Sequence, residues 1–435
     1  MRRTFIHLLG LAALATISAG AVAAPPNVVM IISDDHGWTD YSFMGHPHVR
    51  TPHLDKLASQ GLTFRRGYVP SSLCCPSLGA IITGLYPHQT KICCNDPPIP
   101  PGVKPQGARK HPQYLKQEAE MRTFLDGRLT LPRALGRLGY VSFQTGKWWL
   151  GHFSTAGFSH GMSHGDITKG GRHGDDGLKI GRATMQPIFD FIESATREGK
   201  PFFVWYAPML PHQPHNPPER LLNRYKDKAP TPVAKYWAMV EWFDETCGQL
   251  LDYLDQKKLA DNTMVIYVTD NGWTQSPNAN GAVKSKLTPY DGGLRTPIIV
   301  RWPDRVKPRM TDDLAISIDL APTILTAVGL KPTADMQGIN LLDAQAVGAR
   351  KAIFGECFTH NAVDIHKPVS SLCWRWVIED TWKLIVPAPQ NKPDEKVELY
   401  DLAKDPHEET NLADKEPAKV ERLRQRLDLW WPAND

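Results

Sequence analysis

Two patterns of hydrophobic positions divide the chain into strand-like and helix-like segments. Short runs rich in apolar, aromatic and β-branched residues occupy positions 27–32, 140–145, 201–206 and 264–269. Such runs are typical of strands buried on both faces of a parallel sheet. From Tyr236 to Leu254, apolar residues recur every three or four positions, which predicts a long helix packed on that sheet. The predicted fold class is α/β, with a large mixed, mostly parallel sheet between helices.

The C-terminal part has its own pattern. Residues 381–386 and 398–402 are strand-like, and a last helix would bury Val420, Leu423, Leu427 and Trp430. A chain of 435 residues also exceeds the usual size of one hydrophobic core. We therefore expect a large domain over residues 24–345 and a small antiparallel subdomain with a terminal helix over residues 346–435.

The first residues have the composition of a secretory signal peptide. Arg2 and Arg3 precede an apolar run that ends in the small residues Ala21-Val22-Ala23. Cleavage after Ala23 is favoured, because a cut one residue later would leave Pro25 next to it. We expect residues 1–23 to be removed and the protein to be exported, to a periplasm or to the outside of the cell. A retained membrane anchor is the alternative, and no other apolar stretch is long enough to span a bilayer.

Charge argues against nucleic acid as a partner. The formal net charge of the whole chain is +4, from 50 Lys and Arg against 46 Asp and Glu. Loss of the two arginines in residues 1–23 leaves 48 against 46, a net charge of +2. This balance is weak and no run of basic residues is present, so we do not expect nucleic-acid binding. After signal cleavage we also expect no membrane association, because no further apolar stretch could span a bilayer.

Acidic and amide side chains follow two of the predicted strands. Asp34 and Asp35 come after the run at 27–32, and Asp270 and Asn271 come after the run at 264–269. Aspartate is also common in ordinary turns. However, ligands of open α/β sheets bind beyond the carboxyl ends of the strands, so the repetition predicts a shared site. Oxygen donors of this kind suit a hard divalent cation, and favour Ca²⁺ over Zn²⁺.

The segment from Cys74 to Gly84 predicts a thiol at the start of a helix. Pro76 suits the first helical turn, and Gly84 can end the helix. The free N–H groups at such an end attract anions. The alternative is a buried thiol with a purely structural role.

The same segment resembles the signature of the formylglycine-dependent (type I) sulfatases, Cys-X-Pro-Ser-Arg with a Leu-Thr-Gly-like tail. Ten of its eleven positions fit, and Leu78 stands in the place of the arginine. The stretch from Gly146 to Gly151 resembles the family's Gly-Lys-Trp-His-Leu-Gly, with Trp149 in the place of the histidine. The stretch from Lys286 to Pro297 resembles Lys-X-X-X-Tyr-Glu-Gly-Gly-X-Arg-Val-Pro. The resemblance spans almost the whole mature chain.

The resemblance implies an alkaline-phosphatase-like fold and the hydrolysis of sulfate monoesters. By analogy, a formylglycine-generating enzyme would oxidise Cys74 to an aldehyde, whose hydrate attacks the sulfur. Lys147 and Lys286 would contact the sulfate, and His212 would protonate the leaving alcohol. One Ca²⁺, or Mg²⁺ in its place, would be held by Asp34, Asp35, Asp270 and Asn271.

The two departures from the family motifs predict a slower or differently tuned enzyme. The family arginine at the place of Leu78 holds the hydrate, and indole at Trp149 cannot accept a proton as a histidine would. His152 is a candidate substitute, on proximity in sequence alone. Residues 151–176, rich in glycine and histidine, are expected to form a wall of the substrate pocket.

The sequence does not name one substrate, and it allows two other functions. Sulfated carbohydrates or aryl sulfates are the expected substrates. One alternative is a phosphodiester or phosphonate monoester hydrolase of the same fold, and another is a non-catalytic protein that binds sulfated glycans.

Seven cysteines in an exported chain suggest disulfides. With Cys74 modified, six remain, which is enough for three bonds. We expect Cys357 to pair with Cys373 and Cys75 to pair with Cys93 or Cys94, while Cys247 belongs to a helical core stripe.

Overall fold

An eight-stranded mixed sheet forms the centre of the larger part of the protein in the computed structural model, which describes residues 24–172, 175–278 and 280–434. The predicted signal peptide and His173 of the glycine- and histidine-rich segment lie outside the described residues. Within them, the sheet has the order β4-β3-β5-β1-β6-β7-β2-β8. The five strands from β4 to β6 are mutually parallel, and β7 is antiparallel to both of its neighbours. The predicted mixed, mostly parallel sheet is confirmed.

The strands of this sheet are β1 (Asn27–Ser33), β2 (Leu62–Tyr68), β3 (Val141–Gly146), β4 (His160–Gly161), β5 (Phe202–Ala207), β6 (Thr263–Thr269), β7 (Ile298–Arg301) and β8 (Arg309–Ile316). The helices of the described residues are α1 (Pro52–Gln60), α2 (Cys74–Thr83), α3 (Pro87–Thr90), α4 (Pro105–Ala108), α5 (Pro112–Met121), α6 (Leu131–Gly136), α7 (Gln186–Arg197), α8 (Glu219–Tyr225), α9 (Thr231–Gln256), α10 (Asp291–Leu294), α11 (Leu320–Ala327), α12 (Ala344–Ala349), α13 (Pro368–Ser371) and α14 (Pro417–Trp430).

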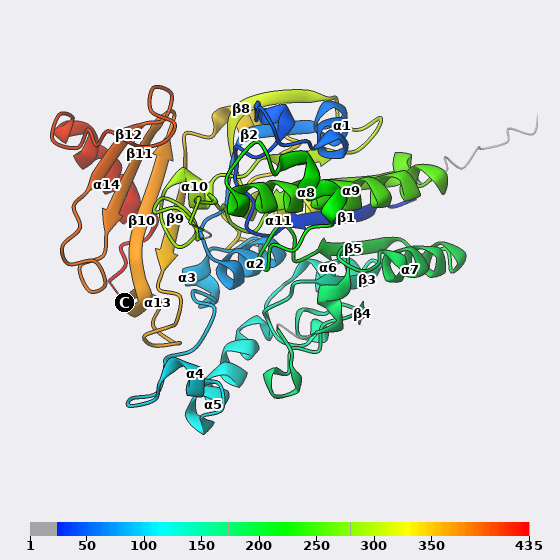
Figure 1. Ribbon diagram of the computed structural model, residues 1–435, viewed down its shortest axis with the longest axis horizontal. Coiled ribbons are helices and arrows are strands. Elements are labelled where there is room, and N and C mark those ends of the chain that lie inside the picture. The colour runs from blue at the N-terminus through cyan, green and yellow to red at the C-terminus, as the bar shows by residue number, and fades with distance from the viewer. Residues whose placement is uncertain (1–23, 173–174, 279, 435) are drawn as a thin grey trace, which may run out of the picture.

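Alternate residues of the central strand β1 enter two different cores. Val28 and Met30 pack in a cluster with residues of α2, α6 and α11, whereas Val29 and Ile31 pack with residues of α1, α7 and α9. Side chains alternate between the two faces of a strand, so a strand covered by helices on both faces must be apolar at every position. The continuous apolar run at 27–32 is explained by this three-layer arrangement (Figure 1).

A four-stranded antiparallel sheet forms the C-terminal part, at the left edge of Figure 1. Its strands are β9 (Ala352–Phe358), β10 (Leu372–Glu379), β11 (Trp382–Pro387) and β12 (Glu398–Asp401), in the order β12-β11-β10-β9. Val377 of β10 packs against α14, while Trp376 packs against residues of the larger part such as Tyr68. The antiparallel subdomain and its terminal helix are confirmed, and the boundary placed at residue 346 stays a prediction.

The expected disulfides are not formed. All seven cysteines are free and buried. The Cys357 thiol lies 3.4 Å from the Ser72 hydroxyl, whereas the Cys373 thiol donates to the Ser371 carbonyl at 3.9 Å. The pairing of β9 with β10 is irregular at this point, so closeness in the sheet does not bring the two sulfur atoms together.

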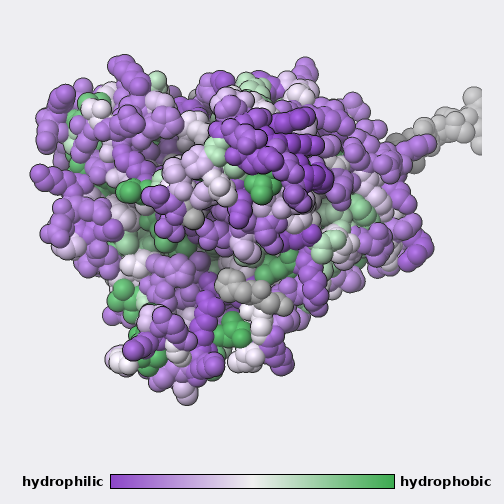
Figure 2. All heavy atoms as spheres, viewed as in Figure 1, coloured by the Kyte–Doolittle hydropathy of each residue, from purple (hydrophilic) through white to green (hydrophobic). Residues whose placement is uncertain are grey.

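The surface shown in Figure 2 is mostly hydrophilic, with hydrophobic residues in small, separate groups. Among the described residues, none of the helices combines the length and the apolar character that crossing a bilayer would require.

Candidate active site

Four adjacent parallel strands deliver the predicted site residues to one edge of the large sheet. In sheet order these strands are β3, β5, β1 and β6. Lys147 directly follows β3, and the loop that carries His212 follows β5. Asp34 and Asp35 follow β1, and Asp270 and Asn271 follow β6. Residues far apart in sequence meet because parallel strands end at the same edge.

Lys147 lies between two aspartates. Its ammonium donates to Asp34 Oδ1 at 2.5 Å and to Asp270 Oδ2 at 2.6 Å. All three side chains are at most 2% exposed. A buried lysine of this kind is stable only because its charge is matched by partners in direct contact.

Asp35 forms the second half of the cluster. Its Oδ1 accepts from Lys286 Nζ at 2.6 Å and from Asn271 Nδ2 at 2.7 Å, and its Oδ2 lies 3.4 Å from His212 Nε2. The backbone of Asp35 has a φ of 55°, a left-handed conformation that aspartate tolerates better than most residues. The backbone N–H groups of Asp35 and Asn271 both donate to Asp270 Oδ1, at 3.3 and 2.6 Å.

Cys74 is the first residue of α2 and points into this cluster. Its sulfur lies 3.0 Å from Lys147 Nζ and 3.6 Å from Asn271 Oδ1. Helix α2 ends at Gly84, which has a φ of 71° and donates its N–H to the Ala80 carbonyl, as predicted. The thiol is 2% exposed.

The charges of the cluster do not balance. Three carboxylates face two ammonium groups, and burial raises the pKa of Asp270 to about 6, although Lys147 opposes the rise. Burial likewise raises the pKa of Asp34 and of the Cys74 thiol against the effect of Lys147. Burial also lowers the pKa of His212 to about 4, in spite of Asp35. The site therefore has an excess of buried negative charge that a further cation would neutralise.

The residues present fit a divalent cation. Asp34 Oδ2 is buried without a hydrogen-bond partner, so one carboxylate oxygen is left for another ligand. One ligand atom each from Asp34, Asp35 and Cys74 lies within 4.8 Å of the others. With Asp270 and Asn271 beside them, the donors are mainly hard oxygen atoms.

Leu78 does not point toward the cluster. It is fully buried in the core between α2 and the sheet, with Val28, Ile81 and Leu320 among its neighbours. A leucine in the place of the family arginine therefore suits the apolar surroundings of position 78.

Trp149 lies close to the cluster and is flanked by two cations. The centre of its ring is 5.8 Å from Lys147 Nζ and 5.6 Å from the guanidinium carbon of Arg172. His152, by contrast, is exposed, and its Nδ1 lies 2.8 Å from the Ser154 hydroxyl. Among the contacts of the described residues, none joins His152 to Cys74, so nothing supports it as a substitute for the family histidine.

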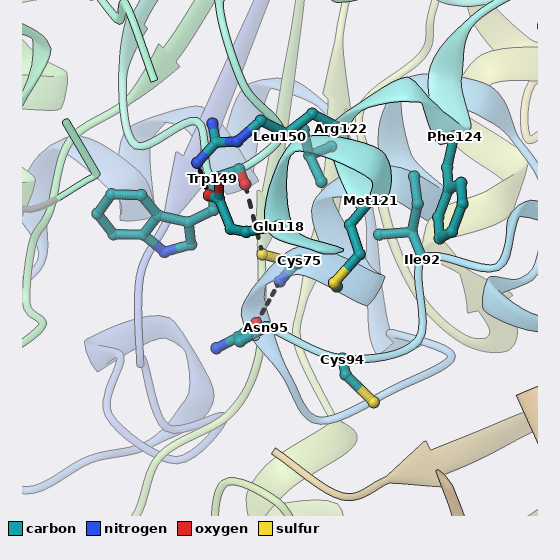
Figure 3. A pocket seen from close by; sticks show the side chains of 10 residues that line it. All are labelled: Cys75, Ile92, Cys94, Asn95, Glu118, Met121, Arg122, Phe124, Trp149 and Leu150. Carbon is teal, nitrogen blue, oxygen red and sulfur yellow. Dashed lines mark hydrogen bonds and ion pairs between the residues drawn. The ribbon is translucent and has the colours of Figure 1, made fainter. Parts of the chain in front are cut away.

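Sequence reasoning missed the residues that hold the start of α2. Figure 3 shows the pocket beside Cys75, where Asn95 Oδ1 accepts from the Cys75 N–H at 2.9 Å and the Trp149 carbonyl accepts from its thiol at 3.8 Å. The Asn95 carbonyl in turn accepts from Arg172 at 3.2 Å, and the same guanidinium pairs with Asp96. No local pattern marks these residues, because each acts through a partner distant in sequence.

Comparison with known proteins gives matches over nearly the whole described chain. The family model described as Sulfatase matches residues 26–330, and the model described as N-sulphoglucosamine sulphohydrolase, C-terminal, matches residues 284–429. The N-acetylgalactosamine-6-sulfatase of Canis lupus familiaris is 28% identical over 386 residues, which cover 79% of this chain and 70% of that protein.

Two solved structures share the fold. The structure of Ps i-CgsB in complex with k-i-k-neocarrahexaose is 21% identical, with a TM-score of 0.75 and coverage of 95% of this chain and 94% of that one. The phosphonate monoester hydrolase of Agrobacterium radiobacter is 18% identical, with a TM-score of 0.69 and coverage of 92% and 94%. Taken with the family matches, these likenesses show that the chain belongs to the sulfatase family and is a sulfatase with an alkaline-phosphatase-like fold.

Proposed function

We propose that this sulfatase hydrolyses sulfate monoesters of sulfated carbohydrates or aryl sulfates, with Cys74 as the source of its nucleophile. The observation that carries the proposal is the 3.0 Å contact between the Cys74 sulfur and Lys147 Nζ. This contact lies inside a buried cluster of carboxylates, at a helix start and at the carboxyl edge of the sheet. Such an environment suits an anionic group that must be held next to a reacting atom.

Cys74 would be converted to formylglycine by a formylglycine-generating enzyme. When formed, the hydrated aldehyde supplies the oxygen nucleophile that attacks the sulfur of the ester. In the absence of that conversion, burial keeps the pKa of the Cys74 thiol above its ordinary value, so the unmodified side chain is a poor nucleophile. The role of Cys74 therefore depends on maturation.

One divalent cation would be held by Asp34, Asp35, Asp270 and Asn271, and we favour calcium over magnesium. Support comes from the free Oδ2 of Asp34, the excess negative charge and the oxygen-rich donor set. When bound, the ion acts as a Lewis acid on oxygen atoms of the nucleophile and of the sulfate.

Lys147, Lys286 and His212 would act on the substrate directly. The two ammonium groups would bind sulfate oxygens and stabilise the charge that develops in the transition state. Both lysines are fully charged, since nearby carboxylates raise the pKa of each despite burial. With Nδ1–H bound to the Gln213 carbonyl, His212 would act as the doubly protonated ring and give its Nε2 proton to the departing oxygen; the Asp35 carboxylate favours this form and burial opposes it.

Relatives support a sulfated glycan as the substrate class. One relative is named as an N-acetylgalactosamine-6-sulfatase, and one structure of the same fold contains a neocarrahexaose. Export, with removal of residues 1–23 and a catalytic domain over residues 24–345, completes the proposal and would bring the enzyme to such extracellular or periplasmic material.

The test uses protein co-produced with a formylglycine-generating enzyme. Mass spectrometry of the peptide containing Cys74 measures conversion, and ion chromatography measures sulfate release from defined sulfated saccharides and from an aryl sulfate. We expect Cys74→Ala to abolish release and the matched control Cys75→Ser to retain it, because the Cys75 thiol contacts the Trp149 carbonyl instead of the cluster. Converted protein that releases no sulfate from any of these esters would overturn the proposal.

A phosphodiester or phosphonate monoester hydrolase is the second candidate, favoured by the fold shared with the Agrobacterium enzyme. Converted protein should be assayed on a matched pair of aryl sulfate and aryl phosphonate monoester. A higher kcat/KM for the phosphonate would select this second candidate.

A further inference from the structure

We infer that Arg182 is a positioning residue for His212, and that it sets the orientation of the proton donor for the leaving group. The inference rests on the role proposed above for His212. Arg182 comes from a turn between β4 and α7, far in sequence from the other site residues.

The loop that carries His212 has few backbone N–H donors of its own. Residues 208–218 contain five prolines in eleven positions, and proline has no N–H to donate. Within this loop, Leu210 N–H donates to the Pro208 carbonyl and Asn216 N–H donates to the Pro214 carbonyl. Other carbonyl groups of the loop, such as those of Met209 and His212, accept from a donor elsewhere in the protein.

Arg182 supplies donors across the whole loop. Its Nε and Nη2 donate to the Met209 carbonyl at 3.0 and 2.7 Å, and Nη2 also donates to the His212 carbonyl at 2.7 Å. Its Nη1 donates to Asn216 Oδ1 at 2.6 Å and to the Pro214 carbonyl at 3.4 Å. These five bonds match the five N–H groups of a guanidinium, whose fixed planar geometry makes it a rigid template.

The turn that bears Arg182 is itself tightly fitted against the end of β5. Gly181 has a φ of 74°, and a Cβ atom at this position would lie 2.8 Å from Tyr206 Oη and 3.0 Å from Pro208 Cβ. Ile180 and Thr184 pair as a short bridge on either side of it. The guanidinium is therefore presented from a packed turn with little freedom to move.

The opposite side of the loop is held by the strand that leads to the cluster. Asp34 N–H donates to the Leu210 carbonyl at 2.9 Å. Between these two supports, His212 Nδ1 donates to the Gln213 carbonyl at 2.7 Å, which leaves Nε2 directed at Asp35 Oδ2, 3.4 Å away. The carbonyl that orients the ring belongs to Gln213, and Arg182 binds the carbonyls of the residues on either side of it, His212 and Pro214.

A double-mutant cycle tests this dependence. We would compare Arg182→Leu, His212→Asn and the double variant on two substrates, nitrophenyl sulfate and an alkyl or phenyl sulfate. Only the second substrate has a leaving group that needs a proton. General acid catalysis commonly contributes about 10²–10⁴-fold, so His212→Asn should lower kcat on that substrate by this factor and Arg182→Leu by about tenfold or more.

The pattern of effects separates positioning from a general structural role. On nitrophenyl sulfate, Arg182→Leu should change kcat by less than about threefold, and in the His212→Asn background it should have no further effect on either substrate. Equal losses on both substrates, or the same loss in both backgrounds, would overturn the inference. If the leucine variant does not fold, Arg182→Lys takes its place, since it keeps the charge and loses part of the fork. Arg197→Leu, at an exposed arginine in the last turn of α7, is the matched control and should behave as the parent.

A second measurement does not depend on activity. Diethyl pyrocarbonate labels accessible histidines, and mass spectrometry gives the rate for His212 relative to exposed His160. Arg182→Leu should speed the labelling of His212 and leave that of His160 unchanged. If the parent hydrolyses no sulfate ester, the proposed function fails, while faster labelling would still uphold the positioning by Arg182. Unchanged labelling of His212 would reject it.

Discussion

The ammonium nitrogen of Lys147 lies 3.0 Å from the sulfur of Cys74 while it also contacts Asp34 and Asp270. One side chain thus links the proposed nucleophile position to the proposed metal ligands. Its proposed contact with a sulfate would require only that the ammonium exchange one of these partners for a substrate oxygen.

Replacement of this lysine should therefore be costly for the reaction. We expect Lys147→Met to lower kcat/KM on an aryl sulfate by about 10²-fold or more, because it removes a preorganised positive charge from a buried site. Steady-state kinetics on fully converted protein measures the loss. Lys200→Met, at a lysine that is 48% exposed and lies outside the proposed site, is the control. A variant at position 147 with parental kcat/KM would contradict the proposed role.

Metal binding should be visible as a change in stability. Added Ca²⁺ should raise the melting temperature of the parent, and chelation should lower it. When the free-ion concentration is one hundred times the Kd, the free energy of unfolding should increase by about 2.7 kcal/mol. Asp34→Asn should largely lose this shift, since it replaces a carboxylate of the cluster. Asp312→Asn changes only an exposed ion pair with Arg65 and should keep the shift. The same Ca²⁺ response in both variants would place the cation elsewhere.

An arginine at position 78, as in the family motif, should destabilise this protein. Leu78 has no exposed surface and lies in an apolar cluster, so Leu78→Arg would bury a charge for which this cluster offers no partner. We expect a loss of about 3 kcal/mol or more in the free energy of unfolding, measured by chemical denaturation. Leu78→Met keeps the volume and should cost less than about 1.5 kcal/mol. If Leu78→Arg is as stable as the parent and turns over faster, the side chain can reach the site after all.

The thiols should be free and unreactive in the folded protein. Burial raises the pKa of Cys75, Cys94 and Cys373 to about 12. A higher pKa means less thiolate, about one part in 10⁴ at pH 8, and the thiolate is the form that reacts with iodoacetamide. We expect slow labelling of native protein, a rise in rate as pH increases, and complete labelling after unfolding without a reductant. Cysteines that label only after reduction would reveal a disulfide.

The contact between the two parts of the protein should depend on one buried lysine. Lys383 of β11 is fully buried and its ammonium lies 2.9 Å from Asp291 Oδ1 and 2.8 Å from Glu408 Oε1. Lys383→Met takes this cation from Glu408 and leaves Asp291 with Arg295, 3.7 Å away, at a cost of about 3–5 kcal/mol. Lys404→Met, at a lysine that is 84% exposed and pairs with Asp401, should be within about 0.5 kcal/mol of the parent. Thermal unfolding of the three proteins makes the comparison, and similar melting temperatures would contradict it.

Much of the fold and the proposed ligand cluster could be predicted without coordinates. Residues 28–32 are all apolar because β1 faces a core on both sides, and this pattern can be recognised from the local sequence. Once β1 and β6 are recognised as parallel strands, Asp34 and Asp270 must leave the sheet at the same edge. Lys147 and His212 were found through motifs that follow the two other strands of this group.

The sequence alone thus determined the elements, the class of fold, and which side chains gather near Cys74, since these depend on short-range periodicity and on where strands end. Only the tertiary structure decided that Leu78 faces the core, that the seven thiols stay apart, that Lys147 sits between two aspartates, and that Arg182 holds the loop of His212. Each of these depends on how loops and side chains from distant segments pack against one another, and no local pattern of residues encodes such long-range contacts.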